Sequence, residues 1–315
     1  MYKSNSNLYQ NPVITRIYGH RGARGVFPEN TMPGFEYLNE IGVNAVELDV
    51  QITKDNIPII LHDPLIPEAL VRDQNGNWLD GPGPKVIQST LQEIQSYNVG
   101  EPKPGNKYNQ RYPEQKVIKN LKIPTLESFY KWAVGKPELL INVEIKSNHY
   151  QPGLIKSPEI VTAIILDMSH QFNLTPRLII SSFDWQILTF VKEYDKTIMR
   201  GYLSQFAKNK PFMPVSSHDE ATSINTRTPL LFGQSIIRFI ASEGGHVWCP
   251  FFEDITPELV SEAHSERISV NVWTVNNETD ITLMLESEVD GIISDYPDKA
   301  QQIATSFFRG EPSKK

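Results

Sequence analysis

The stretch Tyr18–Thr31, YGHRGARGVFPENT, decides how the beginning of this chain folds. It follows the apolar run 13–17, VITRI, which predicts a β-strand. That strand ends by exposing an imidazole, His20, and a permanent cation, Arg21. The polar pair Asn30-Thr31, with a proline two residues later, predicts a capped helix start. The chain therefore opens with a strand, a polar turn and a helix.

The same alternation of short apolar runs and longer amphipathic stretches continues along the chain. Strands are predicted at Ile14–Gly19, Asn44–Val50, Leu140–Ile145, Arg177–Ser182, Ile198–Leu203, His246–Phe251, Ile268–Val275 and Gly291–Ser294. Helices are predicted between most of them, for example at Met32–Ile41, Leu126–Ala133, Pro158–Phe172 and Trp185–Tyr194. Such alternation indicates an α/β fold, and eight strands in a chain of this length favour a closed (β/α)₈ TIM barrel.

Unusual polar residues lie at or just past the carboxyl ends of these predicted strands. They are His20-Arg21, Glu47, Asp49, Glu144, Lys146, Ser181-Ser182, Trp273 and Asp295. In a (β/α)₈ barrel the carboxyl ends of all strands meet on one face, and active sites are built there. The sequence therefore predicts one functional site on this face.

Two long segments interrupt the alternation. Residues 64–120 are rich in Pro, Gly, Asn and Gln, and we expect them to form an insertion on the top face of the barrel. Residues 204–245 are also long for one connection, and we expect extra helix and a lid there. Neither segment resembles an independent domain, so residues 1–315 are predicted to form a single domain.

A β-hairpin is predicted within Glu47–Asp63, ELDVQITKDNIPIILHD. The Asp-Asn pair at 55–56 suits a two-residue type I′ turn with Lys54 opposite Ile57. That register places His62 opposite Asp49, on the face shared with Glu47. A three-residue turn would instead place His62 opposite Leu48, on the other face.

Composition limits the classes of function. The formal charge of −7 in 315 residues disfavours nonspecific nucleic-acid binding but allows a locally positive pocket for an anionic small molecule. Cys249 is the only cysteine, so no intramolecular disulfide can form. Neither a signal peptide nor a membrane-spanning run is recognisable. We therefore expect a cytoplasmic enzyme without stable membrane insertion, and the oligomeric state stays open.

The predicted site combines three kinds of group. Glu47, Asp49 and Glu144 form a cluster of carboxylates, whose oxygen ligands suit Mg²⁺ or Ca²⁺ better than zinc. Arg21 and Lys146 add positive charge for phosphate oxygens, although Lys146 could instead only neutralise Glu144. The two histidines, His20 and His62, remain for proton transfer. Together these groups predict phosphodiester hydrolysis, with the cation and the role of each histidine left open.

The ordered motifs GHRG…PENT, VELDVQITKDNIPIILHDP, NVEIK, ISSFD, VWTVN and DGIISDYP resemble those of the glycerophosphodiester phosphodiesterases, from Gly19 to Pro297. The resemblance implies a TIM barrel related to phosphatidylinositol-specific phospholipases C. It also implies release of glycerol 3-phosphate and an alcohol from a deacylated phospholipid. By this resemblance His20 and His62 are catalytic, and Glu47, Asp49 and Glu144 bind the metal.

The resemblance also places Arg21 and Lys146 near the phosphate, and Trp273 near the glycerol or the leaving group. Packing in the core is an equally good interpretation of Trp273. Asn56 stands where the family usually has glycine, a change that the turn tolerates because Asn adopts the left-handed conformation. The remaining histidines, His149, His170, His218, His246 and His264, are expected at the surface or at caps.

Two alternative functions are compatible with the same motifs. One is a lysophospholipase D or phospholipase C activity on acylated lipids, which requires an apolar track at the pocket mouth; the polar composition of 64–120 argues against it. The other is a catalytically inactive barrel that only binds phosphodiesters or a partner. The intact set of proposed catalytic residues argues against this second alternative.

Overall fold

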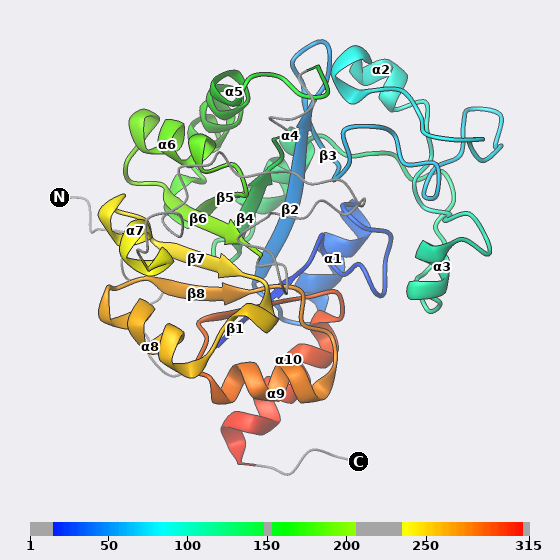
Figure 1. The fold of residues 1–315 in the computed structure, drawn as a ribbon. Helices are drawn as coiled ribbons and strands as arrows, with labels where there is room; N and C mark the ends of the chain where they lie inside the picture. Colours follow the sequence, from blue (N-terminus) through cyan, green and yellow to red (C-terminus); the bar gives the residue numbers. More distant parts are fainter. Residues whose placement is uncertain (1–14, 148–152, 206–234, 311–315) are drawn as a thin grey trace.

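The computed structural model describes residues 15–147, 153–205 and 235–310. Eight parallel strands form a closed barrel in which β1 pairs with both β9 and β2. These strands are β1 (Arg16–Gly19), β2 (Ala45–Ile52), β4 (Leu140–Ile145), β5 (Leu178–Ser182), β6 (Met199–Ser204), β7 (Val247–Pro250), β8 (Ser269–Val272) and β9 (Gly291–Ser294). The predicted TIM barrel is confirmed, and each of the eight predicted strands overlaps an observed one (Figure 1).

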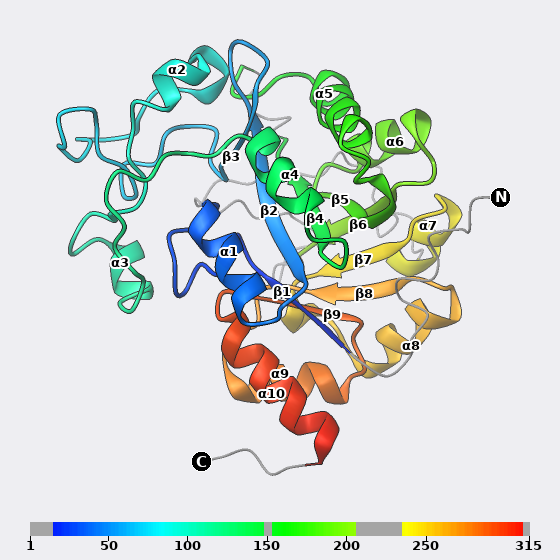
Figure 2. The same cartoon turned by 180° about the vertical axis from the view of Figure 1, so that it is seen from behind.

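Helices surround the barrel on its outer side (Figures 1 and 2). The helices that alternate with the strands are α1 (Met32–Glu40), α4 (Leu126–Val134), α5 (Pro158–Gln171), α6 (Trp185–Tyr194), α7 (Ile236–Ser242), α8 (Pro257–Ser265), α9 (Glu278–Glu286) and α10 (Pro297–Arg309). Two short 3₁₀ turns, Thr175–Arg177 and Phe252–Asp254, accompany them. The four predicted helices are confirmed within one residue at each end.

Two apolar clusters hold these layers together. The inward-facing side chains of the strands, such as Tyr18, Ile179 and Val247, fill the barrel. The outward-facing ones pack against the helices in a much larger cluster. This alternation explains why all eight residues of β2 are buried, including its polar ones.

The predicted hairpin exists, but its predicted register was wrong. Strand β3 (Pro58–Ile60) runs antiparallel to β2, with Ile60 opposite Val50. The loop has three residues, 54–56, because Thr53 pairs with Ile57. The Thr53 N–H donates to the Ile57 carbonyl, and the Ile57 N–H donates to the Thr53 hydroxyl. Asn56 closes this loop with a φ of 63°, so the expected left-handed Asn is confirmed.

Segment 61–125, which includes the residues 64–120 expected as an insertion, lies to one side of the barrel and adds no strand to the sheet (Figure 1). It contains a 3₁₀ turn, Val86–Gln88, and two short helices, α2 (Leu91–Ile94) and α3 (Lys107–Arg111). Its apolar side chains form a separate cluster with the hairpin residue Ile59. In the second predicted excursion, α7 is observed, whereas the expected lid falls in 206–234, outside the described residues.

Candidate active site

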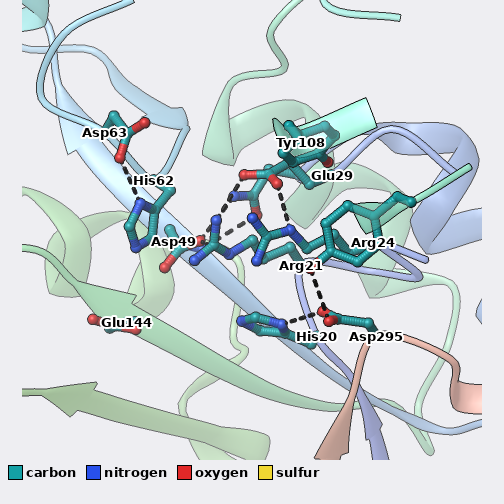
Figure 3. Close-up of polar contacts among 12 residues, drawn as sticks. His20, Arg21, Arg24, Glu29, Asp49, His62, Asp63, Tyr108, Glu144 and Asp295 are labelled. Carbon is teal, nitrogen blue, oxygen red and sulfur yellow. Dashed lines mark hydrogen bonds and ion pairs between the residues drawn. The ribbon is translucent and has the colours of Figure 1, made fainter. Parts of the chain in front are cut away.

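The carboxyl end of the barrel brings together the residues that the sequence singled out. His20 and Arg21 directly follow β1, and Glu47 and Asp49 lie on β2. Glu144 lies on β4, and Lys146 follows that strand. His62 follows the hairpin strand β3, and Trp273 follows β8. Figure 3 shows His20, Arg21, Asp49, His62 and Glu144 around one space.

Three carboxylates form the centre of this space. Each of Glu47, Asp49 and Glu144 offers an oxygen within 4.8 Å of the others. Burial raises the pKa of Glu47 well above its usual range, and the charges of Asp49 and Glu144 raise it further. One oxygen of Glu47, Oε1, is buried without a hydrogen-bond partner among the described residues. Such an orphaned oxygen between like charges fits a divalent cation bound by oxygen ligands.

Two cations, buried Arg21 and half-buried Lys146, contact the same carboxylates. Arg21 Nε lies 3.1 Å from Asp49 Oδ2, while its Nη1 lies 2.7 Å from Glu29 Oε1. Lys146 Nζ lies 2.9 Å from Asp49 Oδ1 and 2.5 Å from Glu144 Oε1. Burial alone would raise the pKa of Asp49, but Lys146 and Arg21 together hold it well below its usual range. The contact of Lys146 with Glu144 agrees with the neutralising interpretation and leaves its role toward phosphate a prediction.

His20 is oriented by a buried aspartate. Its Nδ1 lies 2.6 Å from Asp295 Oδ1, and its Nε2 lies 3.8 Å from Glu47 Oε2. Burial alone would raise the pKa of Asp295. The pKa is nevertheless held below its usual range by the charges of His20 and Arg24 and by hydrogen bonds from His20 and Asn276. An ionised carboxylate only accepts hydrogen bonds, so Nδ1 carries the proton and Nε2 faces the carboxylate cluster. A Cβ at Gly19 would lie 1.9 Å from the Gly22 carbonyl oxygen, so glycine is required where this loop folds back.

His62 reaches the site despite the unexpected register. The ladder ends after the bond from Leu61 N–H to the Asp49 carbonyl, so strand alternation no longer governs the next residue. The Gln51 side chain then donates to the His62 carbonyl at 2.9 Å, which draws this residue over the inward face of β2. Its Nδ1 lies 2.7 Å from Asp63 Oδ1. Burial lowers the pKa of His62, and the nearby charges of Arg21 and Lys146 lower it further.

Several further residues support the site besides the predicted catalytic, substrate-binding and metal-binding ones. Asn30 donates to Asp49 Oδ2 at 2.8 Å, and Glu29 bridges Arg21 and Arg24. Burial alone would raise the pKa of Glu29, but the two arginines lower it to about 2. Asp295 belongs to the quoted motif DGIISDYP and follows a strand end, so its position was a usable signal.

Trp273 lies half-buried just beyond β8. Its ring packs edge-on against Phe183, at 5.4 Å between centroids, and against Phe251 at 5.5 Å. Its Nε1 donates to the Cys249 carbonyl at 2.9 Å. These contacts give Trp273 a packing role, and contact with substrate stays a prediction.

The remaining histidines differ from one another. His170 and His264 lie at the surface as expected, where they pair with Asp195 and Asp290. His246 is half-buried, and burial lowers its pKa to about 4. Residues 149 and 218 fall outside the described ranges.

The motifs and the site geometry agree with a known family. The sequence model of the glycerophosphoryl diester phosphodiesterase family matches residues 20–299. The chain belongs to this family. The family expected from the sequence motifs is thereby confirmed, and so is the prediction that the protein is a phosphodiesterase. Within the described ranges, no helix has the length and apolar character that a bilayer crossing requires.

Individual relatives support this assignment along nearly the whole chain. A glycerophosphodiester phosphodiesterase of Caldanaerobacter subterraneus is 29% identical over 90% of this chain and 95% of its own length. A protein of Silicibacter pomeroyi, provisionally named a glycerophosphoryl diester phosphodiesterase, is 32% identical in sequence to this chain. Its crystal structure matches 97% of this chain and 98% of its own, with a TM-score of 0.84. A phosphodiesterase of Oleispira antarctica, solved with its product sn-glycerol-3-phosphate, shares the fold with a TM-score of 0.67. Its sequence is 22% identical, and the match covers 93% of this chain and 98% of its own.

Proposed function

We propose that this chain hydrolyses glycerophosphodiesters to glycerol 3-phosphate and an alcohol, with one divalent cation, Mg²⁺ or Ca²⁺. The observation that carries the proposal is the convergence of two carboxylate-oriented imidazoles on a buried three-carboxylate cluster. The names of the relatives and the product bound to the Oleispira antarctica phosphodiesterase support the substrate class.

Glu47, Asp49 and Glu144 hold the cation in this proposal. When bound, the cation would supply positive charge to a phosphate oxygen and lower the cost of packing three carboxylates together. Arg21 and Lys146 lie beside the same cluster and bind the remaining phosphate oxygens. Their positive charge is fixed in place by ion pairs to Asp49, so it does not need to reorganise when negative charge develops.

The two histidines transfer the protons. Each engages a carboxylate through Nδ1, at 2.6 Å for His20 and 2.7 Å for His62, so each presents Nε2 to the substrate. One Nε2 accepts the proton of the attacking hydroxyl as the new P–O bond forms. The other donates a proton to the alcohol oxygen as the old P–O bond breaks. The nucleophile is either water or the glycerol 2-hydroxyl; the second route passes through a cyclic phosphate.

The alternative activity on acylated lipids has less support. It requires an apolar track at the mouth, but the apolar side chains of segment 61–125 are mostly packed into the segment's own cluster. The inactive-barrel alternative predicts binding without turnover.

The test is release of glycerol 3-phosphate from glycerophosphocholine by the purified protein. We expect release that stops with EDTA and returns when Mg²⁺ or Ca²⁺ is restored. A His20→Ala variant should lose turnover while it still binds the substrate. Turnover only on lysophospholipids would favour the first alternative, and binding without turnover by the wild-type protein would favour the second.

A further inference from the structure

The insertion reaches back to one of the two histidines through a single tyrosine. Tyr112 follows α3 in segment 61–125, and its hydroxyl donates to Asp295 Oδ2 at 2.9 Å. The other oxygen of the same carboxylate, Oδ1, holds His20 Nδ1 at 2.6 Å. We propose that Tyr112 is a positioning residue: its hydroxyl fixes the Asp295 carboxylate and, through it, the ring of His20. This inference rests on the proposed function, in which His20 transfers a proton.

The bonds around Asp295 explain why one hydroxyl matters. Asp295 is fully buried, and its Oδ2 accepts from Asn276 Nδ2 at 2.8 Å as well as from Tyr112. Its backbone N–H donates to Asn276 Oδ1 at 2.9 Å. The two donors on Oδ2 fix the plane of the carboxylate and leave Oδ1 free for His20. Without the tyrosine hydroxyl, Asn276 is the one described donor left on Oδ2, so rotation of the carboxylate about its Cβ–Cγ bond is less restrained and the imidazole can follow it.

Tyr112 itself is buried and is packed against the loop that follows β1. Only 2% of the residue is exposed, and the guanidinium of Arg24 lies 4.9 Å above its ring. Arg24 is in turn ion-paired with Glu29 at 2.6 Å, and its carbonyl accepts from the Gln115 side chain at 2.7 Å. The insertion and the loop after β1 therefore clamp each other next to the histidine. Figure 3 shows Asp295, His20, Arg24 and Glu29 in this arrangement.

This geometry gives the insertion a part in the chemistry of the site. The Tyr112 hydroxyl is bonded to Asp295 and so is not available to bind the substrate. Removal of this hydroxyl should therefore change the orientation of His20 and leave substrate affinity unaltered. The expected effect is a lower kcat at an unchanged KM. A merely structural tyrosine would lower stability without this separation.

The experiment compares Tyr112→Phe with a matched control, Tyr130→Phe. Tyr130 is also buried, and its hydroxyl bonds to Ser169 between α4 and α5, away from the site. With glycerophosphocholine as substrate, we expect Tyr112→Phe to lower kcat about tenfold at an unchanged KM. Tyr130→Phe should retain the wild-type kcat. Equal kcat values for the two variants and the wild type, or equal losses in both variants, would overturn the inference.

A double-mutant cycle with Asp295→Asn tests the route of the effect. If Tyr112 acts through Asp295, Tyr112→Phe should cause no further loss, within about twofold, in the Asp295→Asn background. An undiminished tenfold loss in that background would show that Tyr112 acts by another route, and would refute the inference.

A measurement without substrate separates this inference from the proposed function. Nitrogen NMR of histidine-labelled protein, with the His20 signals assigned by a His20→Gln variant, should place the proton on Nδ1. Tyr112→Phe should change the Nδ1 proton resonance, whereas Tyr130→Phe should not. If the wild-type protein turns over no glycerophosphodiester but the resonance responds as expected, the proposed function fails and the positioning role stands. An unchanged resonance in Tyr112→Phe contradicts the positioning role whatever the activity.

Discussion

Cation binding should stabilise the fold, because the carboxylate cluster is strained by repulsion without it. Two unit charges 4.8 Å apart interact by about 3 kcal/mol at an effective dielectric constant of about 20, and the three ligand atoms lie within that distance of one another. Arg21 and Lys146 offset part of this repulsion. A divalent cation adds further compensation, which is available only to the folded chain.

The expected increase in Tm follows from linkage. At a free cation concentration one hundred times Kd, a folded state gains about 2.7 kcal/mol. For 315 residues the unfolding entropy is about 0.7 kcal/mol/K, so Tm should rise by about 4 °C. The assay is thermal unfolding in EDTA and in a series of Mg²⁺ and Ca²⁺ concentrations.

The pH dependence of this increase has a defined sign. Burial and neighbouring carboxylates raise the pKa of Glu47, and burial also raises that of Glu144. Without cation, the folded chain therefore binds more protons at these two groups than the unfolded chain. Their contribution to stability decreases as pH rises above the ordinary carboxyl pKa. The cation replaces those protons, so the increase in Tm should be larger at pH 8 than at pH 5.

Two variants make this prediction refutable. Glu144→Gln removes one charged ligand, and a hundredfold weaker Kd would reduce the increase in Tm to less than about 1 °C at the same cation concentration. The control Glu127→Gln changes an exposed carboxylate on α4, paired with Lys131, and should keep the full increase. The reasoning fails if neither cation raises Tm, or if Glu144→Gln responds like the wild-type protein.

Two further predictions concern the loop and the phosphate site. Asn56→Ala should lower the free energy of unfolding by about 1 kcal/mol in urea titrations, because at a φ of 63° alanine lacks the short polar side chain that lets Asn adopt the left-handed conformation. Asn56→Gly should be nearly neutral, because glycine adopts this conformation without a Cβ, and equal losses in both variants would contradict the turn assignment. Arg21→Lys should lower kcat/KM by roughly a hundredfold, since an ammonium cannot span Glu29 and Asp49 as the guanidinium does. Full activity of Arg21→Lys would remove Arg21 from the proposed phosphate site.

The fold was predictable because its signals are local. Apolar runs gave the strands, and polar residues at their carboxyl ends indicated the functional face. In a barrel the backbone brings these ends together without any knowledge of side-chain contacts. Glu47 and Asp49 could be matched with Glu144 for this reason, and Asp49 indeed pairs with Glu144 across β2 and β4.

The hairpin shows where local signals are insufficient. The pair Asp55-Asn56 suits a two-residue turn, but the Thr53 hydroxyl bonds to Ile57 N–H and lengthens the loop by one residue. His62 still reaches the site, because Gln51 binds its carbonyl after the ladder has ended. The predicted convergence of His62 with Asp49 therefore rested on a register that the structure does not have.

The support of His20 was beyond local reasoning. Asp295 could be noticed at a strand end, but its bond to Tyr112 joins positions 183 residues apart. The sequence of the insertion is rich in loop-forming residues and gives no sign of which side chain points to the barrel. Only the folded chain places this tyrosine next to the aspartate.

The central claim is that two histidines and a bound cation hydrolyse a glycerophosphodiester. Phosphorus NMR of glycerophosphocholine with the wild-type protein, His20→Gln and His62→Gln, each with Mg²⁺ or Ca²⁺, tests it most directly. The account predicts a growing glycerol 3-phosphate signal with the wild-type protein, and rates lower by about a thousandfold or more in both variants, although each still gains thermal stability from the cation. Conversion at wild-type rates by either variant, or an unchanged spectrum with the wild-type protein under both cations, would contradict it.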